Sequence, residues 1–406
     1  MNDRQGKLDM ADMDQAAVFT IPQLRKRRGA KWHRYPDDVI PCWVAEMDAS
    51  VAAPIQAAMQ TIVREQEYGY PLRDGDRAEL AVSRAFARRM QNRFGWTVDP
   101  DDVFTSTDLV QTSFSSVLAF SDPGDKVVLQ TPAYPPFRDA IEGTGRVLLA
   151  DPLVDDGSRY VMDLDRLARS IDARTRMLVF CHPHNPTGRV FERDELEAVG
   201  RLAIERDLII VSDEIHADLV FPGRKHIPLA SLSPAIAART VTITSATKSF
   251  NIPGLRCGVL HFGTPALKER FEARVPRKLL GQPSIAGIDA TVVAWDECQS
   301  WLDGTLTSLQ AMRDRLANRL RRDLPEARFY LPEATYMAWI DFSALRLRVP
   351  AAEFFLQNAK VAASPGESFD ASCGDFLRLN YATSPAILDE ILARMLRALR
   401  ANAAAA

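Results

Sequence analysis

The chain has 406 residues, of which 47% are hydrophobic, 25% charged and 8% aromatic. This composition is that of a globular protein with a large core, and the length predicts two or three packed units, which excludes a minimal binding module. The formal net charge of −3, with basic residues dispersed among acidic ones, favours neither nucleic acid nor a membrane surface as a partner.

The sequence indicates a reduced, cytoplasmic protein. Its five cysteines are odd in number, widely spaced and never arranged as C-x-x-C, so we expect no disulfide framework. Residues 1–18 are polar and aperiodic and lack the basic and apolar regions of a secretion signal, so we expect a flexible arm there. No window approaches the roughly 18 apolar residues of a membrane span.

Between Lys126 and His261 the sequence alternates short apolar runs with polar or amphipathic stretches. Runs that are apolar at every position suit strands covered on both faces, which is typical of a mostly parallel sheet flanked by helices. The predicted strands are VVLQ, VLLA, MLVF, LIIV, VTIT and VLHF. The segment Glu192–Arg206 begins with acidic residues and repeats apolar ones on one face, so it predicts a crossover helix within an α/β unit.

After about Pro283 the pattern changes to that of a second, smaller α+β unit. Helices are predicted over Ile285–Trp301 and Leu306–Leu324, and Pro325 ends the second. The segment ARFYLPEATYMAWIDFS predicts a strand pair and FLRLNYA another strand. An apolar repeat from about Ala386 predicts a C-terminal helix.

Several widespread catalytic motifs are absent from the sequence. These are the G-x-x-x-x-G-K-[ST] phosphate loop, G-x-G-x-x-G, H-E-x-x-H and G-x-S-x-G. Cys181, His182 and His184 are of metal-ligand type, but no second Cys or His pair follows at finger spacing. We therefore predict no metal site.

Polar residues follow three of the predicted strands. MLVF is followed by CHPHNPTG, LIIV by SDEIH and VTIT by SATKSFN. Because the carboxyl ends of parallel strands form the ligand crevice of an open sheet, we expect Asn185, Asp213 and Lys248 to converge there. Each alone has an ordinary explanation as a turn former, a helix cap or a solvated amine. Together with an anion site, an amine and a carboxylate are what pyridoxal phosphate requires.

Longer motifs then resemble a known family. SDEIHADL, SATKSFNIPGLRCG, CHPHNPTGRV, TPAYPPF and FLRLNYATS resemble fold-type I pyridoxal-phosphate enzymes of the class I/II aminotransferase superfamily, in order and spacing from about residue 40 to 385. IPCWVAEMDAS and EYGYP resemble the MalY/PatB branch of cystathionine β-lyases and C–S lyases. The resemblance implies a large domain with a mostly parallel, seven-stranded sheet and a smaller α+β domain. The expected division is an arm (1–18), a segment joining the small domain (19–50), the large cofactor-binding domain (51–290) and the small domain (291–406).

The resemblance also implies roles around the cofactor ring. Lys248 would form the Schiff base with the cofactor and later move the Cα proton of the substrate. Asp213 would pair with the pyridinium nitrogen, and Asn185 would hydrogen-bond the ring 3′-oxygen. Tyr134 would stack on the ring, with core packing as its alternative. His216 would lie near the 3′-oxygen or serve as a structural histidine.

The phosphate group would be bound by side chains and helix amides together. The resemblance assigns this role to Ser245, Thr247 and Arg256, with the amides of Leu109 and Val110 at a helix N-terminus. Arginine at position 256 is usual in true aminotransferases and often missing in the MalY/PatB branch.

Substrate and subunit contacts follow from the same resemblance. Arg378 would hold the substrate α-carboxylate through a bidentate pair, and Trp43, Val44 and Asn185 would line that pocket. Tyr70 of EYGYP would reach the phosphate of the neighbouring subunit, which implies a homodimer. The alternative for Tyr70 is an ordinary aromatic residue in a turn.

Two positions depart from the family pattern. Asp108 stands where relatives usually have glycine, and His182 where they commonly have asparagine. Asp108 and Gln111 predict an N-cap with a capping-box partner. A carboxylate repels a phosphate dianion, so either Asp108 turns away and leaves the helix amides free, or the site binds its cofactor more weakly than relatives do.

The leading functional hypothesis is β-elimination from an L-cysteine S-conjugate, such as cystathionine, giving a thiol, pyruvate and ammonia. One alternative is an aminotransferase, which Arg256 favours. Another is a specialised-pathway enzyme that decarboxylates or oxidatively deaminates an amino-acid conjugate, which Asp108 and His182 favour. A regulatory role in which the dimer binds another protein is the non-enzymatic alternative.

Overall fold

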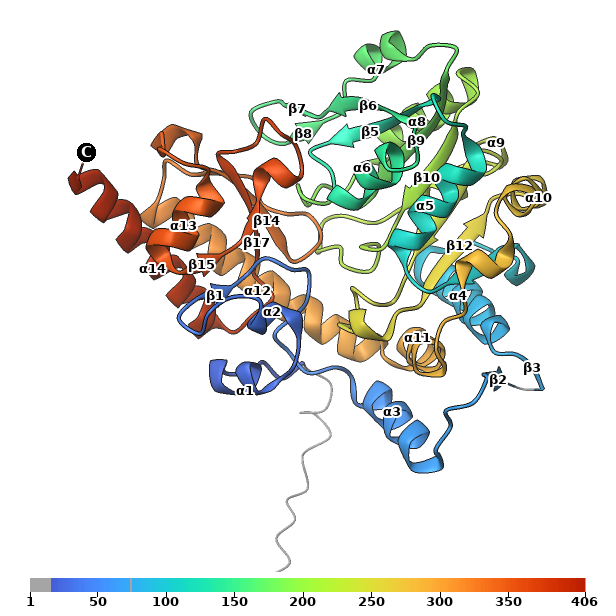
Figure 1. Cartoon of the computed structure of the whole chain (residues 1–406), viewed down its shortest axis with the longest axis horizontal. Coiled ribbons are helices and arrows are strands. Elements are labelled where there is room, and N and C mark those ends of the chain that lie inside the picture. Colours follow the sequence, from blue (N-terminus) through green and yellow to red (C-terminus); the bar gives the residue numbers. More distant parts are fainter. Residues whose placement is uncertain (1–15, 74, 406) are drawn as a thin grey trace, which may run out of the picture.

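The computed structural model describes residues 16–73 and 75–405. Two sheets lie side by side, the larger on the right of Figure 1 and the smaller on the left, and the long helix α12 (Gln299–Asp323) extends along the small sheet toward the larger one. Of the predicted arm, residues 1–15 lie outside the described residues, whereas Val18 forms an antiparallel bridge with Ala49.

Among the described residues, seven strands form the large sheet. Only β12 is antiparallel to its two neighbours, so the prediction of a mostly parallel sheet is confirmed. In spatial order the strands are β4 (Val103–Ser106), β12 (Gly258–Phe262), β11 (Thr240–Thr244), β10 (Ile209–Asp213), β9 (Thr175–Cys181), β5 (Lys126–Thr131) and β6 (Val147–Pro152).

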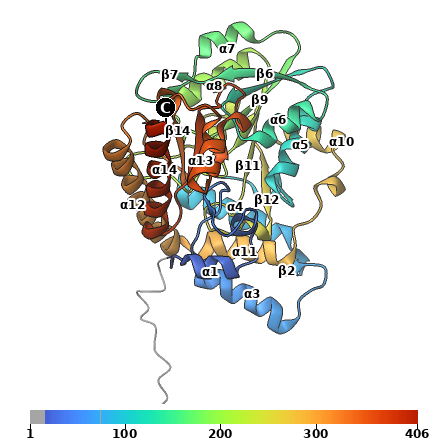
Figure 2. The same ribbon diagram turned by 60° about the vertical axis from the view of Figure 1, so that its left-hand side comes forward.

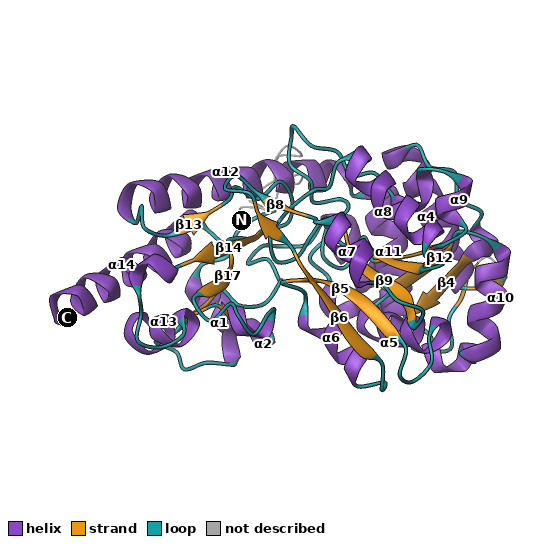
Figure 3. Ribbon diagram, turned by 90° about the horizontal axis from the view of Figure 1, so that it is seen from above, coloured by secondary structure: helices purple, strands orange, loops and turns teal. Residues whose placement is uncertain are grey.

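Helices cover both faces of this sheet, which explains why its strands are apolar at every position. In β9, Val179 packs into the cluster beneath α5 and α6, while its neighbour Phe180 packs into the cluster beneath α7 and α8. Figure 3 shows these two helix pairs on opposite sides of the strands. The covering helices are α5 (Leu109–Phe120), α6 (Pro135–Glu142), α7 (Leu164–Ser170), α8 (Arg193–Glu205), α9 (Pro234–Ala237) and α10 (Pro265–Arg274).

Three further helices pack together beside the β4 edge. They are α3 (Ala53–Glu65), α4 (Glu79–Phe94) and α11 (Ile285–Glu297). Helix α11 ends earlier than the predicted segment Ile285–Trp301 because the chain breaks at Cys298 and restarts as α12. The expected domain boundary between residues 290 and 291 falls inside α11, and the division into domains stays a prediction.

The small sheet is antiparallel and lies beside three helices. Its strands are β13 (Arg328–Phe329), β14 (Met337–Asp341), β17 (Phe376–Asn380) and β16 (Ser364–Pro365). The predicted strand pair is confirmed as β13 and β14, and the predicted C-terminal helix as α14 (Pro385–Ala405). With α12 and α13 (Ala351–Ala359), α14 completes this unit.

The N-terminal segment joins the small unit through a short parallel pair. Strand β1 (Ile40–Pro41) pairs with β15 (Val361–Ala362). The remaining short elements are α1 (Ile21–Lys26), α2 (Ala30–His33) and the pairs β2 (Leu72–Arg73) with β3 (Asp76–Arg77) and β7 (Val154–Asp155) with β8 (Tyr160–Val161).

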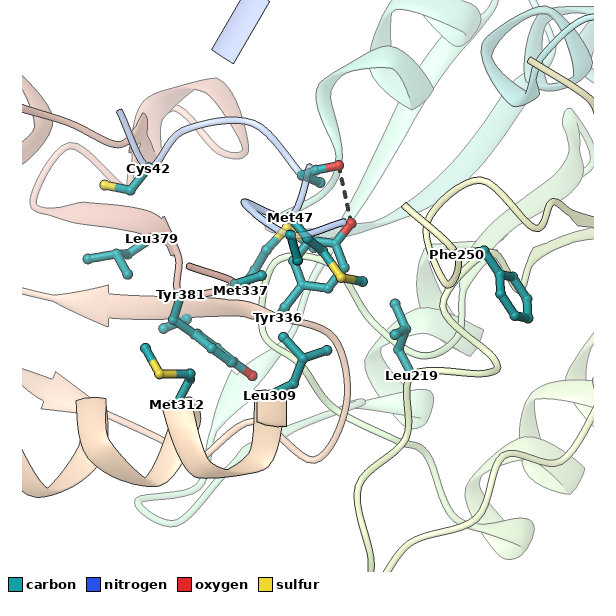
Figure 4. Packing of buried hydrophobic residues seen from close by; sticks show 14 of the residues in the cluster. Cys42, Met47, Leu219, Phe250, Leu309, Met312, Tyr336, Met337, Leu379 and Tyr381 are labelled. Atoms are coloured by element: carbon teal, nitrogen blue, oxygen red, sulfur yellow. Dashed lines mark hydrogen bonds between the residues drawn. The ribbon is translucent and has the colours of Figure 1, made fainter. Parts of the chain in front are cut away.

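One hydrophobic cluster continues from one sheet to the other. Figure 4 shows Met47 of the N-terminal segment beside Tyr336 and Met337, with Leu309 on α12 and Leu219 on the side of the large sheet. Since all five side chains are buried, this cluster fixes the two sheets against each other. Within residues 16–73 and 75–405, no helix is long and apolar enough to cross a membrane.

Candidate active site

Three neighbouring parallel strands of the large sheet end at one cavity. Asp213 at the end of β10 lies opposite Cys181 of β9 and Ile243 of β11. The segments that follow β9 and β11 bring Asn185 and Lys248 to the same cavity, whose volume is about 360 Å³. The expected convergence of Asn185, Asp213 and Lys248 is confirmed.

Nearly all of the predicted site residues line this cavity, although they come from both units. Those that do are Trp43, Val44, Leu109, Val110, Tyr134, Asn185, Asp213, His216, Ser245, Thr247, Lys248, Arg256 and Arg378. Tyr70 does not: it lies between α3 and β2 with 99% of its surface exposed.

The amine of Lys248 is held by a backbone carbonyl of the N-terminal segment. Its Nζ donates to the oxygen of Ala45 at 3.0 Å, and that oxygen also accepts the hydroxyl of Tyr336 at 3.2 Å. Burial, followed by the positive charge of Arg378, lowers the pKa of Lys248 to about 8. A sizeable fraction of this amine is therefore neutral near physiological pH, as a nucleophile must be.

Asp213 is buried beneath the same cavity. Its Oδ1 accepts the amide of Ile215 at 3.0 Å, which is the one hydrogen bond that its carboxylate accepts from the described residues. Burial raises the pKa of Asp213 to about 7, while that amide and Lys248 act in the opposite direction. A positively charged group next to the carboxylate would restore its ionised form.

Arg378 on β17 closes the cavity from the side of the small sheet. Its guanidinium donates to Asn185 Oδ1 at 2.9 Å, to the Trp43 carbonyl at 3.0 Å and to Ser364 Oγ at 3.1 Å. Burial lowers the pKa of Arg378 to about 10. Among the described residues no carboxylate forms an ion pair with it, so this buried cation is available for an anionic ligand.

The N-terminus of α5 offers backbone donors at another part of the cavity. The amides of Leu109 and Val110 have no acceptor in the described part of the chain, as expected for the first positions of a helix. Nearby, Ser245 Oγ donates to the Cys257 carbonyl at 2.7 Å and accepts the Thr247 amide at 3.1 Å. Free helix amides beside hydroxyl groups make an anion-binding surface.

Asp108 caps α5 and also pairs with Arg256. Its Oδ1 accepts the Gln111 amide at 2.9 Å, which confirms the predicted N-cap, and its Oδ2 lies 3.0 Å from an Arg256 nitrogen. The predicted capping box is wrong in one respect, because Gln111 turns back to the amide and hydroxyl of Thr107 instead of the Asp108 amide. The Asp108 side chain thus turns toward Arg256.

The aromatic residues around the cavity differ in their surroundings. Tyr134 lines it and packs edge-on against Phe137, with ring centroids 5.7 Å apart. His216 also lines it, and burial lowers its pKa to about 3, so it is neutral. His182 does not line the cavity; it is buried and stacks on His226 with ring centroids 4.7 Å apart.

Two contacts in the site were missed by sequence reasoning. Ala45 acts through its carbonyl, and no side chain signals that role. The Ser364 hydroxyl accepts a hydrogen bond from Arg378 and donates one to the Trp43 carbonyl at 2.6 Å, but the sequence around it carries no motif. Both contacts depend on the placement of the N-terminal segment, whose carbonyls at Ala45 and Trp43 meet Lys248 and Ser364.

Comparison with known proteins identifies the family and the fold. The family model of aminotransferase class I and II matches residues 48–395. The chain is 34% identical to the cystathionine beta-lyase PatB of Bacillus subtilis over 89% of this chain and 93% of PatB. Among solved structures, it superposes on OvoB (36% identity, TM-score 0.87, 95% of this chain and 98% of that one). It also superposes on a putative PLP-dependent beta-cystathionase of Corynebacterium diphtheriae (31% identity, TM-score 0.88, 95% and 99%).

These matches extend over both sheets and the cavity between them. The predicted fold-type I architecture and the resemblance to the PatB and MalY branch are therefore confirmed. The chain belongs to the aminotransferase class I and II family.

Proposed function

We propose that this protein is a pyridoxal-phosphate-dependent C–S β-lyase. It would convert an L-cysteine S-conjugate and water into a thiol, pyruvate and ammonia. The observation that carries the proposal is the pairing of a partly buried amine of lowered pKa, Lys248, with a buried guanidinium, Arg378, that has no acidic partner among the described residues, across one cavity. The guanidinium suits the α-carboxylate of an amino acid, and the neutral amine suits the cofactor aldehyde and the Cα proton. The similarity to a cystathionine beta-lyase and a beta-cystathionase supports the reaction type.

The cavity residues fit pyridoxal phosphate. Lys248 supplies the amine for its aldehyde, and Asp213 has a carboxylate oxygen free for a ring N–H. The unpaired amides of Leu109 and Val110 supply donors for the phosphate. Because a pyridinium charge would lower the raised pKa of Asp213, binding of the ring relieves part of the cost of burying this carboxylate.

Each group has a definite task in the reaction. When bound, the cofactor withdraws electrons from the substrate Cα and so makes its C–H and Cβ–S bonds easier to break. Arg378 holds the substrate carboxylate and thereby orients Cα toward Lys248. The neutral Lys248 amine accepts the Cα proton, and the electron pair left behind expels the sulfur from Cβ, which leaves as thiol after protonation. Asp213 would hold a proton on the ring nitrogen through its free carboxylate oxygen.

An aminotransferase is the second candidate. One observation favours it: Arg256, expected in true aminotransferases, lines the cavity. In that reaction the amino group would pass to a 2-oxo acid, and no bond to sulfur would break. The two candidates share Lys248, Asp213 and Arg378 and differ in the fate of the Cβ substituent.

We also propose that the chain acts as a homodimer in the cytoplasm. The turn between α3 and β2 stands away from the body in Figures 1 and 2, and Tyr70 on it is 99% exposed. Tyr68 and Leu72 beside it are 70% and 59% exposed, an arrangement suited to burial against a second copy. Tyr70 would then contact the phosphate in the partner's cavity. The five cysteines, all within the described residues, are free, which suits a reducing compartment.

The test compares the wild type with Lys248→Ala and Arg378→Lys on an S-alkyl cysteine, without a 2-oxo acid. We expect the wild type to release thiol, Lys248→Ala to release none, and Arg378→Lys to show mainly a raised KM because its bidentate geometry is lost. Thiol release at equal rates by the wild type and Lys248→Ala would refute the proposal.

A further inference from the structure

Asp108 lies in the cavity next to the donors that fit a phosphate group. It is the N-cap of α5, directly before the two amides without acceptors. Its carboxylate is bound on both oxygens, by the Gln111 amide through Oδ1 and by Arg256 through Oδ2. The Asp108 carboxylate therefore already accepts hydrogen bonds from one backbone amide of α5 and from the Arg256 guanidinium.

The end of a strand pair brings these two residues near each other. Strands β4 and β12 are antiparallel and their pairing ends with Ser106 opposite Gly258, so Asp108 and Arg256 each lie two residues beyond this last pair. Gly258 permits the close approach, because a Cβ there would come within 2.5 Å of Ser106 Oγ. The strand pairing thus brings Asp108 and Arg256 near each other, and the Arg256 side chain, which is 67% exposed, completes the contact.

The turn at Asp108 is held independently of its carboxylate. Its carbonyl oxygen accepts the Thr112 hydroxyl at 2.8 Å and the Thr112 amide at 3.1 Å, and the Ser106 hydroxyl lies 3.2 Å away. The backbone position of Leu109 and Val110 is therefore expected to survive a change in the side chain at position 108.

We propose that Asp108 is an internal competitor of the cofactor phosphate and sets how tightly this protein holds its cofactor. The inference rests on the proposed cofactor. A phosphate dianion brought to the Leu109 and Val110 amides meets an arginine whose charge Asp108 already neutralises, and it also meets the negative charge of Asp108 itself. To use Arg256 fully, the phosphate must displace the Asp108 carboxylate. The cofactor is therefore held less tightly than the same cavity would hold it without this charge.

The test measures cofactor affinity directly. Apoprotein is titrated with pyridoxal phosphate, and the visible absorption of the bound form gives the dissociation constant. Asp108→Asn removes the charge and keeps a capping oxygen for the Gln111 amide, so α5 stays capped. We expect Asp108→Asn to bind the cofactor about tenfold more tightly than the wild type. Asp108→Ser, which has a capping hydroxyl, should show the same gain in cofactor affinity. It replaces Asp108→Asn in the test if that variant folds poorly.

Asp163→Asn is the matched control. Asp163 caps α7 with the same geometry, accepting the Arg166 amide at 2.9 Å, and its Oδ2 lies 4.0 Å from the Arg166 guanidinium. It does not line the cavity. The control removes the same charge from the protein and should leave cofactor affinity unchanged.

Arg256→Gln tests whether Asp108 acts through the arginine. This substitution should weaken cofactor binding more in the Asp108→Asn background than in the wild type, because Asp108 no longer neutralises the arginine there. Unchanged or weaker binding by Asp108→Asn would overturn the inference, as would equal effects of Arg256→Gln in both backgrounds. The proposed function fails separately, if the wild type binds no pyridoxal phosphate. In that case calorimetry with inorganic phosphate still decides the role of Asp108, with tighter binding expected for Asp108→Asn.

Discussion

Replacing Asp213 by Asn should stabilise the apoprotein and abolish its cofactor-dependent activity. Asp213 is only 5% exposed, and burial raises its pKa from 3.8 to about 7. The asparagine keeps an oxygen for the Ile215 amide and carries no charge to bury. A shift of about three pKa units at about 1.4 kcal/mol each corresponds to about 4 kcal/mol.

The pH dependence of this effect has a defined sign. Because the pKa of an acid is raised in the folded state, the native wild type binds more protons than the unfolded chain between about pH 4 and pH 7, and its stability falls as pH rises through that window. Relative to the wild type, Asp213→Asn should gain about 2 kcal/mol at about pH 5 and about 4 kcal/mol at about pH 8.

The assay is denaturant unfolding of the apoproteins at a fixed protein concentration across this pH range. Asp165→Asn, an exposed position on α7, is the control and should show no such pH-dependent gain. The claim is that burial of the Asp213 carboxylate destabilises the folded apoprotein. It would be refuted if the stability difference stayed constant with pH, or if the Asp213→Asn apoprotein were less stable than the wild type at pH 8. Added pyridoxal phosphate should reverse the order, stabilising the wild type more than the variant.

Three further predictions concern the site. The rate at which apoprotein reacts with pyridoxal phosphate should rise with pH through about 8, because the neutral form of Lys248 is the nucleophile; a rate that falls over this range would contradict the lowered pKa. Ser364→Ala should raise KM a few-fold with a smaller change in kcat, because Arg378 loses one of its hydrogen bonds; steady-state kinetics would show an unchanged KM if this contact is unimportant. Mixing inactive Lys248→Ala with Tyr70→Ala subunits should restore activity, because one cavity of the mixed dimer has both residues; no recovery after subunit exchange would oppose the proposed contribution of Tyr70 across the interface.

The sequence predicted those parts of the fold and site that depend on local patterns. The strands LIIV and VTIT were recognisable because helices cover both faces of the sheet, and Asp213 and Lys248 because polar residues follow such strands. The direction of β12 was not predictable, since an apolar run has the same appearance in either orientation. Strand β4 was missed because its four residues, VFTS, carry little apolar signal.

Contacts between distant segments were the other limit. The bond from Lys248 to the Ala45 carbonyl and the pair formed by Asp108 and Arg256 join residues far apart in the chain. Asp108 stood out in the sequence as a departure from the family pattern, but its partner depends on the pairing of β4 with β12. Sequence reasoning therefore identified the residue and left the direction of its side chain open.

The most direct test of the central claim is to follow every product from one amino-acid substrate. The cofactor-loaded protein is incubated with L-cystathionine in the absence of a 2-oxo acid, and thiol, pyruvate and ammonia are measured together. The account predicts that the three accumulate in equal amounts over many turnovers while the cofactor keeps its aldehyde form. Absence of thiol, with amino-group transfer once a 2-oxo acid is added, would contradict the lyase assignment and identify an aminotransferase.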